Sequence, residues 1–131
     1  MSSSVDCIFC SKKNCKIIKT TKYFFVIRDT AYPVTKHHTL IITNRHIENY
    51  FDLTKNEIVE LDEIIKQQKK ELLNLDKNIS GYNIGTNVGK DAGQSIMHCH
   101  IHLIPRRKGD VEDPRGGVRG VIPSKQKYKR R

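Results

Sequence analysis

The sequence predicts a single α+β domain in which one long helix covers one face of a mainly antiparallel sheet of four or five strands. Three observations predict it: short runs of β-branched and aromatic residues, one amphipathic stretch with helical periodicity, and short turns between them. The chain has 131 residues, of which 37% are hydrophobic and 29% charged, a composition that suits one folded domain. We expect the order strand, strand, helix, strand, strand.

The first two strands and the helix occupy the first part of the chain. The runs Tyr23–Arg28 and Thr39–Thr43 are rich in β-branched and aromatic residues, and both are expected to be strands. Pro33 lies between them and separates the two strands. The helix is expected from Thr54 to about Asp76, where apolar residues recur at helical spacing. Thr54 is followed three residues later by Glu57, the pattern of a capping box, so the start of the helix is well defined.

The last two strands enclose a glycine-rich turn. Tyr82–Asn87 and His98–Ile104 are the expected strands, and residues 89–93 form the turn between them. Pro105 is expected to stop the last strand, because proline lacks the N–H that a sheet ladder uses.

Three histidines stand at strict two-residue intervals in the last strand: His98, His100 and His102. On a strand, this spacing places the three imidazoles on one face, about 7 Å apart. A solvent-exposed polar face would explain a lone histidine, but three in register indicate a site with chemistry. They could form a catalytic metal site, or one imidazole could be a nucleophile that the others assist.

A cluster of hydrogen-bond donors just upstream favours the nucleophile. Asn87, Gly93 and Ser95 offer an amide, a backbone N–H and a hydroxyl, all suitable donors for phosphate oxygens. A catalytic metal site calls for no such cluster. The pattern therefore predicts a phosphate group beside the central histidine, His100, whose imidazole with a reference pKa of about 6.5 is mostly neutral at pH 7.

These residues resemble the signature of a known family. The run Gly93-Gln94-Ser95-x-x-His98-x-His100-x-His102 is similar to the motif of the histidine triad (HIT) family of nucleotide hydrolases and transferases. The resemblance begins at residues 6–10, resumes at Asp29 and at residues 38–46, and ends at residues 105–107. One departure is Thr43, where the family usually has proline, and we expect little consequence.

The resemblance implies a HIT-like fold and roles for individual residues. His100 is the nucleophile that attacks the α-phosphorus of a nucleotide and becomes transiently nucleotidylated, and His98 belongs to the same triad. His102 contacts the phosphate and assists the leaving group, and His38 is a buried histidine that supports the triad. Alternation places only one of His37 and His38 on the triad side, and the resemblance favours His38. Nucleotide contacts are implied for five residues: Asp29, Asn87, Gly93, Gln94 and Ser95.

Asp29 has two interpretations. In the family, the matching carboxylate accepts hydrogen bonds from ribose hydroxyls, which suits the chemistry of a strong acceptor. An aspartate before Pro33 can equally be a turn residue that binds its own backbone.

The C-terminal part carries most of the net charge of +10, with ten Lys or Arg against three Asp or Glu in residues 106–131. Such a segment can be a solvated end, a surface for nucleic acid, or a surface that attracts an oligophosphate. The resemblance divides the single domain 1–131 into a core of about 5–108 and a basic extension, 109–131. Because nucleic-acid binding would leave the three aligned histidines unexplained, we do not expect nucleic acid as a partner.

Residues 109–123 resemble the C-terminal extension of family members that act on dinucleoside polyphosphates. The resemblance thus implies diadenosine tetraphosphate or a related compound as the substrate. Four arginines could pair with the additional phosphates: Arg106, Arg107, Arg115 and Arg119. The alternatives are a nucleoside phosphoramidase of the Hint-like branch, a dinucleoside polyphosphate phosphorylase that uses phosphate in place of water, and a non-catalytic nucleotide-binding protein.

Cys7 and Cys10 form the one close cysteine pair, which is a metal half-site or a redox dithiol. A redox dithiol is expected where a strand enters a helix in a thioredoxin-like pattern, and that context is missing here. The resemblance implies a structural zinc site of Cys7, Cys10, His46 and His98. The other two cysteines, Cys15 and Cys99, are expected to be ordinary thiols.

The expected setting is the cytoplasm, without a membrane. The N-terminus has neither a basic start nor an apolar run, and no stretch approaches the roughly 18 apolar residues of a membrane span. The resemblance implies a homodimer, and a single helix cannot cover every apolar edge of a five-stranded sheet.

Overall fold

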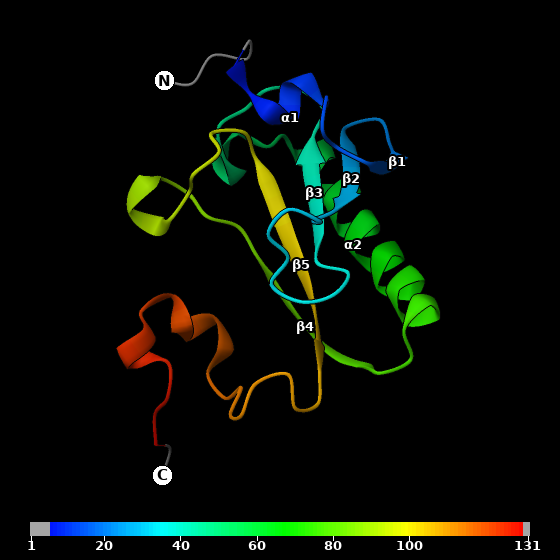
Figure 1. The fold of residues 1–131 in the computed structure, drawn as a ribbon. Coiled ribbons are helices and arrows are strands. Elements are labelled where there is room, and N and C mark those ends of the chain that lie inside the picture. Colours follow the sequence, from blue (N-terminus) through cyan, green and yellow to red (C-terminus); the bar gives the residue numbers. More distant parts are fainter. Residues whose placement is uncertain (1–5, 130–131) are drawn as a thin grey trace.

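The computed structural model describes residues 6–129 and contains one antiparallel sheet with the strand order β1-β2-β3-β5-β4 (Figure 1). The strands are β1 (Ile17–Thr20), β2 (Phe24–Arg28), β3 (Thr39–Thr43), β4 (Ile79–Gly85) and β5 (His100–Arg107). Two α-helices accompany them, α1 (Ile8–Ser11) and α2 (Lys55–Leu75). The predicted α+β fold, with about five antiparallel strands and one long helix, is confirmed. Residue 5, the predicted start of the core, and residues 130–131 lie outside the described residues.

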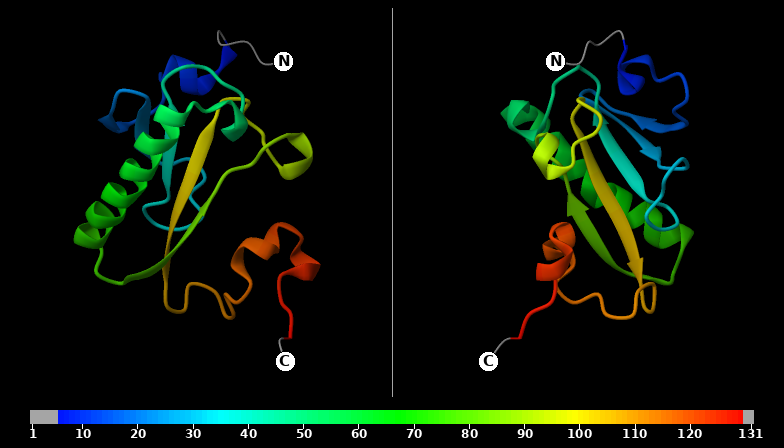
Figure 2. Two further views of the ribbon diagram at one scale, coloured as in Figure 1. Left: turned by 180° about the vertical axis from the view of Figure 1, so that it is seen from behind. Right: turned by 60° about the vertical axis from the view of Figure 1, so that its left-hand side comes forward.

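The sheet separates two layers of apolar side chains, because successive residues of a strand point to opposite faces. One face packs against α2. Phe24, Val26, Ile41 and Ile101 of the sheet contact Leu61 and Ile64 of the helix there. The other face packs against the N-terminal segment. Phe25, Ile27, Leu40 and Ile42 of the sheet contact Cys7 and Phe9 of that segment there. Figure 2 shows α2 along one face of the sheet and the short α1 near the other. No helix among residues 6–129 is long and apolar enough to cross a membrane.

The start of α2 is fixed by the predicted capping box, which is confirmed. The Thr54 hydroxyl accepts from the Glu57 N–H at 3.2 Å, and the Glu57 carboxylate accepts from the Thr54 N–H at 2.8 Å. The buried Glu57 carboxylate also accepts two hydrogen bonds from Arg45, at 2.8 and 2.9 Å. This bidentate pair lowers the pKa of Glu57 and ties the residue next to His46 to the helix.

The last strand differs from the prediction at both ends. It begins at His100 instead of His98, and it continues past Pro105 to Arg107. Proline is accepted because β3 begins at Thr39, which pairs with Leu103, so no strand residue on that side faces Pro105 and needs its missing N–H. The Pro105 carbonyl instead accepts a hydrogen bond from the Thr35 hydroxyl at 2.7 Å.

Other boundaries also differ. Strand β4 begins at Ile79 and ends at Gly85, whereas Tyr82–Asn87 was predicted, so Asn87 follows the strand. Gly81 lies inside the strand next to a shift in register, which is a usual place for glycine. The short elements β1 and α1 were not predicted, because four-residue segments with mostly exposed side chains leave little periodicity to detect.

The C-terminal extension is folded in its described part, where two short 3-10 helices span Gly117–Val121 and Pro123–Lys125. Its path leaves the end of β5 and turns back toward the sheet (Figures 1 and 2).

Candidate functional site

The histidine row begins just before β5 and continues along it. His100 and His102 pair with Ile42 and Leu40 of β3, on the face opposite α2, with ring centroids 5.3 Å apart. The Phe9 ring packs edge-to-face with His100 and with the buried His98, with ring centroids 5.1 and 5.9 Å apart. The N-terminal segment therefore covers the first two histidines.

Backbone contacts fix the proton of His100. Its Nδ1 lies 2.7 Å from the carbonyl oxygen of His98, which can only accept a hydrogen bond. His100 therefore carries its proton on Nδ1. Its Nε2 keeps a free lone pair, as a nucleophile requires.

A second chain of contacts fixes the proton of His102. The Val34 N–H donates to Nδ1 of His38 at 3.0 Å, so the neutral His38 ring carries its proton on Nε2. That Nε2 lies 2.9 Å from Nδ1 of His102, which must accept. His102 then presents an N–H at Nε2, and the buried His38 is the residue that sets it. The contribution of Val34 could not be predicted, because it comes from the backbone.

Burial keeps these imidazoles neutral. It lowers the pKa of His38, and the nearby Asp29 carboxylate only partly offsets the effect. It also lowers the pKa of His100, against the opposing effect of the hydrogen bond to the His98 carbonyl. The pKa of His102 falls to about 4, through burial and then through the neighbouring His100 and His38.

Two cavities flank the histidine row. One, the Asp29 cavity, is lined by Asp29, Phe9, Leu40 and Ile96 among others. The other, the extension cavity, is lined by His38, His102, Asn87 and residues of the C-terminal extension. The ring of His100 contacts Phe9 of the first cavity and His102 of the second. His100 thus contacts one lining residue of each cavity.

Asp29 is a turn aspartate, which is one of the two interpretations of the sequence. One carboxylate oxygen accepts from the N–H groups of Ala31 and Tyr32, at 3.2 and 3.0 Å, as a turn aspartate does. The other oxygen lies 3.9 Å from Nδ1 of His38. The same residue lines the Asp29 cavity.

The loop before the histidines contains the other predicted nucleotide contacts. Gly93 has φ +95°, a left-handed conformation that favours glycine, and the neighbouring Ser95 is exposed. Gln94 is buried, and its side-chain amide accepts from the Gly89 N–H and donates to the carbonyls of Glu48 and Ile96. Gln94 therefore holds the loop through backbone groups, while Asn87 lines the extension cavity.

The structure brings Cys7, Cys10, His46 and His98 together, with their ligand atoms all within 4.8 Å of one another. Nδ1 of His98 lies 3.2 Å from Cys7 Sγ and 3.4 Å from Cys10 Sγ, and Nδ1 of His46 lies 3.1 Å from Cys10 Sγ. Nε2 of His98 donates to the carbonyl of Thr43 at 2.8 Å, so its Nδ1 lone pair faces the cysteines. This is the donor set of a closed tetrahedral zinc site.

The remaining cysteines do not belong to this group. Cys99 is buried on the α2 face, and burial raises its pKa to about 12, as expected for an unreactive thiol. Burial also raises the pKa of Cys15.

The four arginines considered for phosphate binding already have partners within the chain. Arg106 binds Asp110 with two hydrogen bonds of 2.8 Å, and Arg107 binds Asp76 at 2.9 Å. In the extension, Arg115 lies 3.7 Å from Asp113. Arg119 donates to the Lys125 carbonyl and stacks on the Tyr128 ring.

Comparison with known proteins places these features in a family. The HIT domain model matches residues 11–109. The bis(5′-adenosyl)-triphosphatase of Dictyostelium discoideum is 34% identical over 98 residues, which are 75% of this chain and 64% of that enzyme, so this chain spans less than two thirds of it. The adenosine 5′-monophosphoramidase of Candida albicans is 32% identical over 119 residues, covering 82% and 74% of the two chains.

Among solved structures, a zinc-bound histidine triad family protein from Mycobacterium smegmatis superimposes with a TM-score of 0.75 at 28% identity. The match covers 85% of this chain and 82% of that one. The family match spans the histidine row, and the resemblance noted in the sequence is confirmed. The chain belongs to the HIT domain family.

Proposed function

We propose that this protein is a nucleotide hydrolase or transferase that attacks the α-phosphorus of a nucleotide with Nε2 of His100. One observation supports this most directly: the His98 carbonyl holds the proton of His100 on Nδ1, which leaves a free Nε2 lone pair between two cavities. Because burial lowers the pKa of His100, this lone pair is available at neutral pH without a separate base.

In the first step, a bond forms between His100 Nε2 and the α-phosphorus while the bond from that phosphorus to the leaving oxygen breaks. The N–H that we assign to His102 Nε2 is the proposed hydrogen-bond donor to the leaving oxygen. His38 is the positioning residue that keeps this proton on Nε2. Asn87, Ser95 and the Gly93 N–H are the proposed donors to phosphate oxygens, with Gln94 shaping their loop. In the second step, the oxygen of water bonds to the phosphorus while the bond from phosphorus to Nε2 breaks, which returns the lone pair to His100 and releases a proton from the water.

The proposed substrate is diadenosine tetraphosphate or a related dinucleoside polyphosphate, with the first nucleoside in the Asp29 cavity. Named relatives include both a dinucleoside triphosphatase and a phosphoramidase, so relatedness does not choose between them. The cavities on both sides of His100 favour a substrate with two large halves.

Product analysis in ¹⁸O-labelled water tests the reaction. We expect diadenosine tetraphosphate to yield adenosine monophosphate that carries the label, because water attacks the α-phosphorus in the second step. Parallel reactions with an adenosine phosphoramidate and with added phosphate separate phosphoramidase and phosphorylase activity from hydrolysis. Label in the triphosphate product alone would contradict attack at the α-phosphorus, and ligand binding without turnover would favour a non-catalytic role.

We also propose that the protein forms a homodimer. Strand β4 is an edge of the sheet, and next to it a cavity is lined by Tyr50, Ile58, Ile65 and Ile84, which a partner could bury. Light scattering at micromolar concentrations is expected to give about 30 kDa, twice the chain mass of 15.1 kDa. A mass near that of one chain over the whole range would contradict the dimer.

Zinc is the proposed cofactor, with a structural role. Cys7 and His98 are buried, and the four side chains supply a complete Cys₂His₂ set, which leaves no ligand position for substrate. Bound zinc would join the N-terminal segment to the histidine row. The cytoplasm keeps such thiols reduced, and it is the compartment that we propose.

A further inference from the structure

The extension cavity lies between the β4–β5 surface and the folded C-terminal extension, with a volume of about 550 Å³. His38 and His102 line it from the histidine row, and Val118 and Val121 line it from the extension. Its volume is within the usual range of small-molecule sites. Because His102 is adjacent to His100, a substrate held at His100 can extend into this cavity on its leaving side.

Glycines build the extension as a defined wall. Gly116 has φ +87°, and a Cβ placed there would lie only 2.0 Å from the carbonyl oxygen of Gln126. A Cβ on Gly120 would lie 2.7 Å from the side-chain oxygen of the same glutamine. A Cβ on Gly117 would lie 3.2 Å from the amide nitrogen of Asn83 in β4. The extension thus packs closely on itself and on the sheet, as a fixed part of the cavity.

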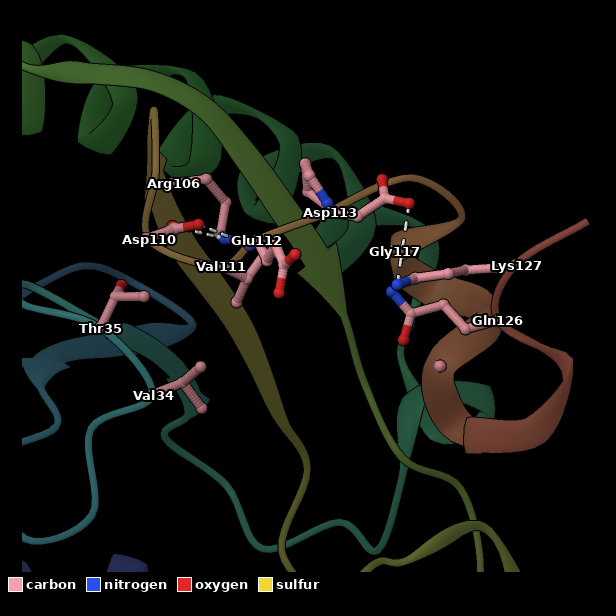
Figure 3. A pocket seen from close by; sticks show the side chains of 12 residues that line it. Val34, Thr35, Arg106, Asp110, Val111, Glu112, Asp113, Gly117, Gln126 and Lys127 are labelled. Carbon is pink, nitrogen blue, oxygen red and sulfur yellow. Dashed lines mark hydrogen bonds and ion pairs between the residues drawn. The ribbon is translucent and has the colours of Figure 1, made fainter.

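The lining lacks a free positive charge within the described part of the chain. Arg106 is its one arginine or lysine, and the guanidinium is held by Asp110 and by the Asn83 side-chain oxygen at 2.7 Å. Figure 3 shows this Arg106–Asp110 pair, and Asp113 joined to Lys127, in the neighbouring cavity under the extension. The chemistry of the lining therefore does not suit a phosphate chain.

Apolar side chains dominate instead, and several of them have no cover. Val34, Val118 and Val121 line the cavity although they are 67%, 67% and 77% exposed. The side-chain amide of Asn83 accompanies them. A nucleobase has two apolar faces and a polar edge, so it matches both parts of this lining, and its binding would remove the exposed apolar area from water.

We propose that the extension cavity receives the nucleoside of the leaving half of the substrate, and that Val118 and Val121 of the extension make the protein selective for substrates with two nucleosides. This inference rests on the proposed function, because it takes His100 as the point of attack. In this inference the valines of the extension bind a base, and its arginines do not bind the phosphates.

The test compares diadenosine tetraphosphate with adenosine 5′-tetraphosphate, which has the same phosphate chain and lacks only the second nucleoside. We expect the double variant Val118→Asp/Val121→Asp to lower kcat/KM for the dinucleotide by about tenfold or more. For adenosine tetraphosphate, kcat/KM should stay within about twofold. Gly116→Ala, which displaces the wall without adding charge, should cause the same selective loss. Val111→Asp introduces one such carboxylate in the extension but outside this cavity, so it should leave both substrates unaffected.

Equal losses for the two substrates, or no loss for either, would overturn the inference. Dissociation constants of both nucleotides, measured in parallel, separate it from the proposed function. If the unmodified protein turned over neither compound, the proposed function would fail. A selective loss of dinucleotide affinity in the double variant would still support the nucleoside subsite, and unchanged or equally reduced affinities would overturn it.

Discussion

Replacement of His100 by alanine is expected to abolish turnover and to change nucleotide affinity by less than about tenfold. The variant removes the Nε2 lone pair that forms the bond to phosphorus, and no other group of the row can replace it. His98 Nε2 donates to the Thr43 carbonyl, and His102 Nδ1 is occupied by His38. Ground-state binding depends mainly on the two cavities, whose linings do not include His100.

The measurement is kcat with diadenosine tetraphosphate, together with the dissociation constant from calorimetry. His37→Asn is the matched control, because His37 lies outside the row at φ +70°, a conformation that asparagine tolerates. The control should retain wild-type turnover. Wild-type turnover by purified His100→Ala protein would eliminate the nucleophile mechanism.

Sequence patterns were sufficient for features that depend on side-chain type and local spacing. The two-residue interval of His100 and His102 predicted a strand on which they share a face, and the Thr54–Glu57 pair located the start of α2. Resemblance to the family joined Cys7 and Cys10 to His46 and His98, which are far apart in the chain. Local spacing alone could not have made that connection, since it depends on how the N-terminal segment crosses the sheet.

Features that depend on backbone groups or on the return of the chain were not predictable. The proton positions of His100 and His102 are set by the His98 carbonyl and the Val34 N–H, which no residue type reveals. The charge of the extension suggested phosphate contacts, whereas its described arginines pair with acidic side chains, a backbone carbonyl or an aromatic ring. Its glycines gave the better signal, because they permit the close packing that forms a cavity wall.

Loss of the proposed zinc ion is expected to be the second large effect. Cys7→Ser should reduce bound zinc from about one ion per chain to far less, and lower the melting temperature by more than about 5 °C. The ligands come from three separate stretches of chain, so the binding energy contributes to folding. Activity should fall as well, because His98 has two roles. Its ring supplies a proposed zinc ligand, and its carbonyl orients His100.

Elemental analysis of protein purified without chelator and thermal unfolding are the two measurements, so the result does not depend on an activity assay. Cys15→Ser is the matched control: it removes a thiol near the same segment that lies outside the proposed ligand set, and it should keep both the metal and the melting temperature. Much less than one zinc per chain in the unmodified protein, with unchanged stability of Cys7→Ser, would show that these side chains form no metal site. In that case the N-terminal segment would be held over the histidine row by apolar packing, which includes Phe9 and Cys7.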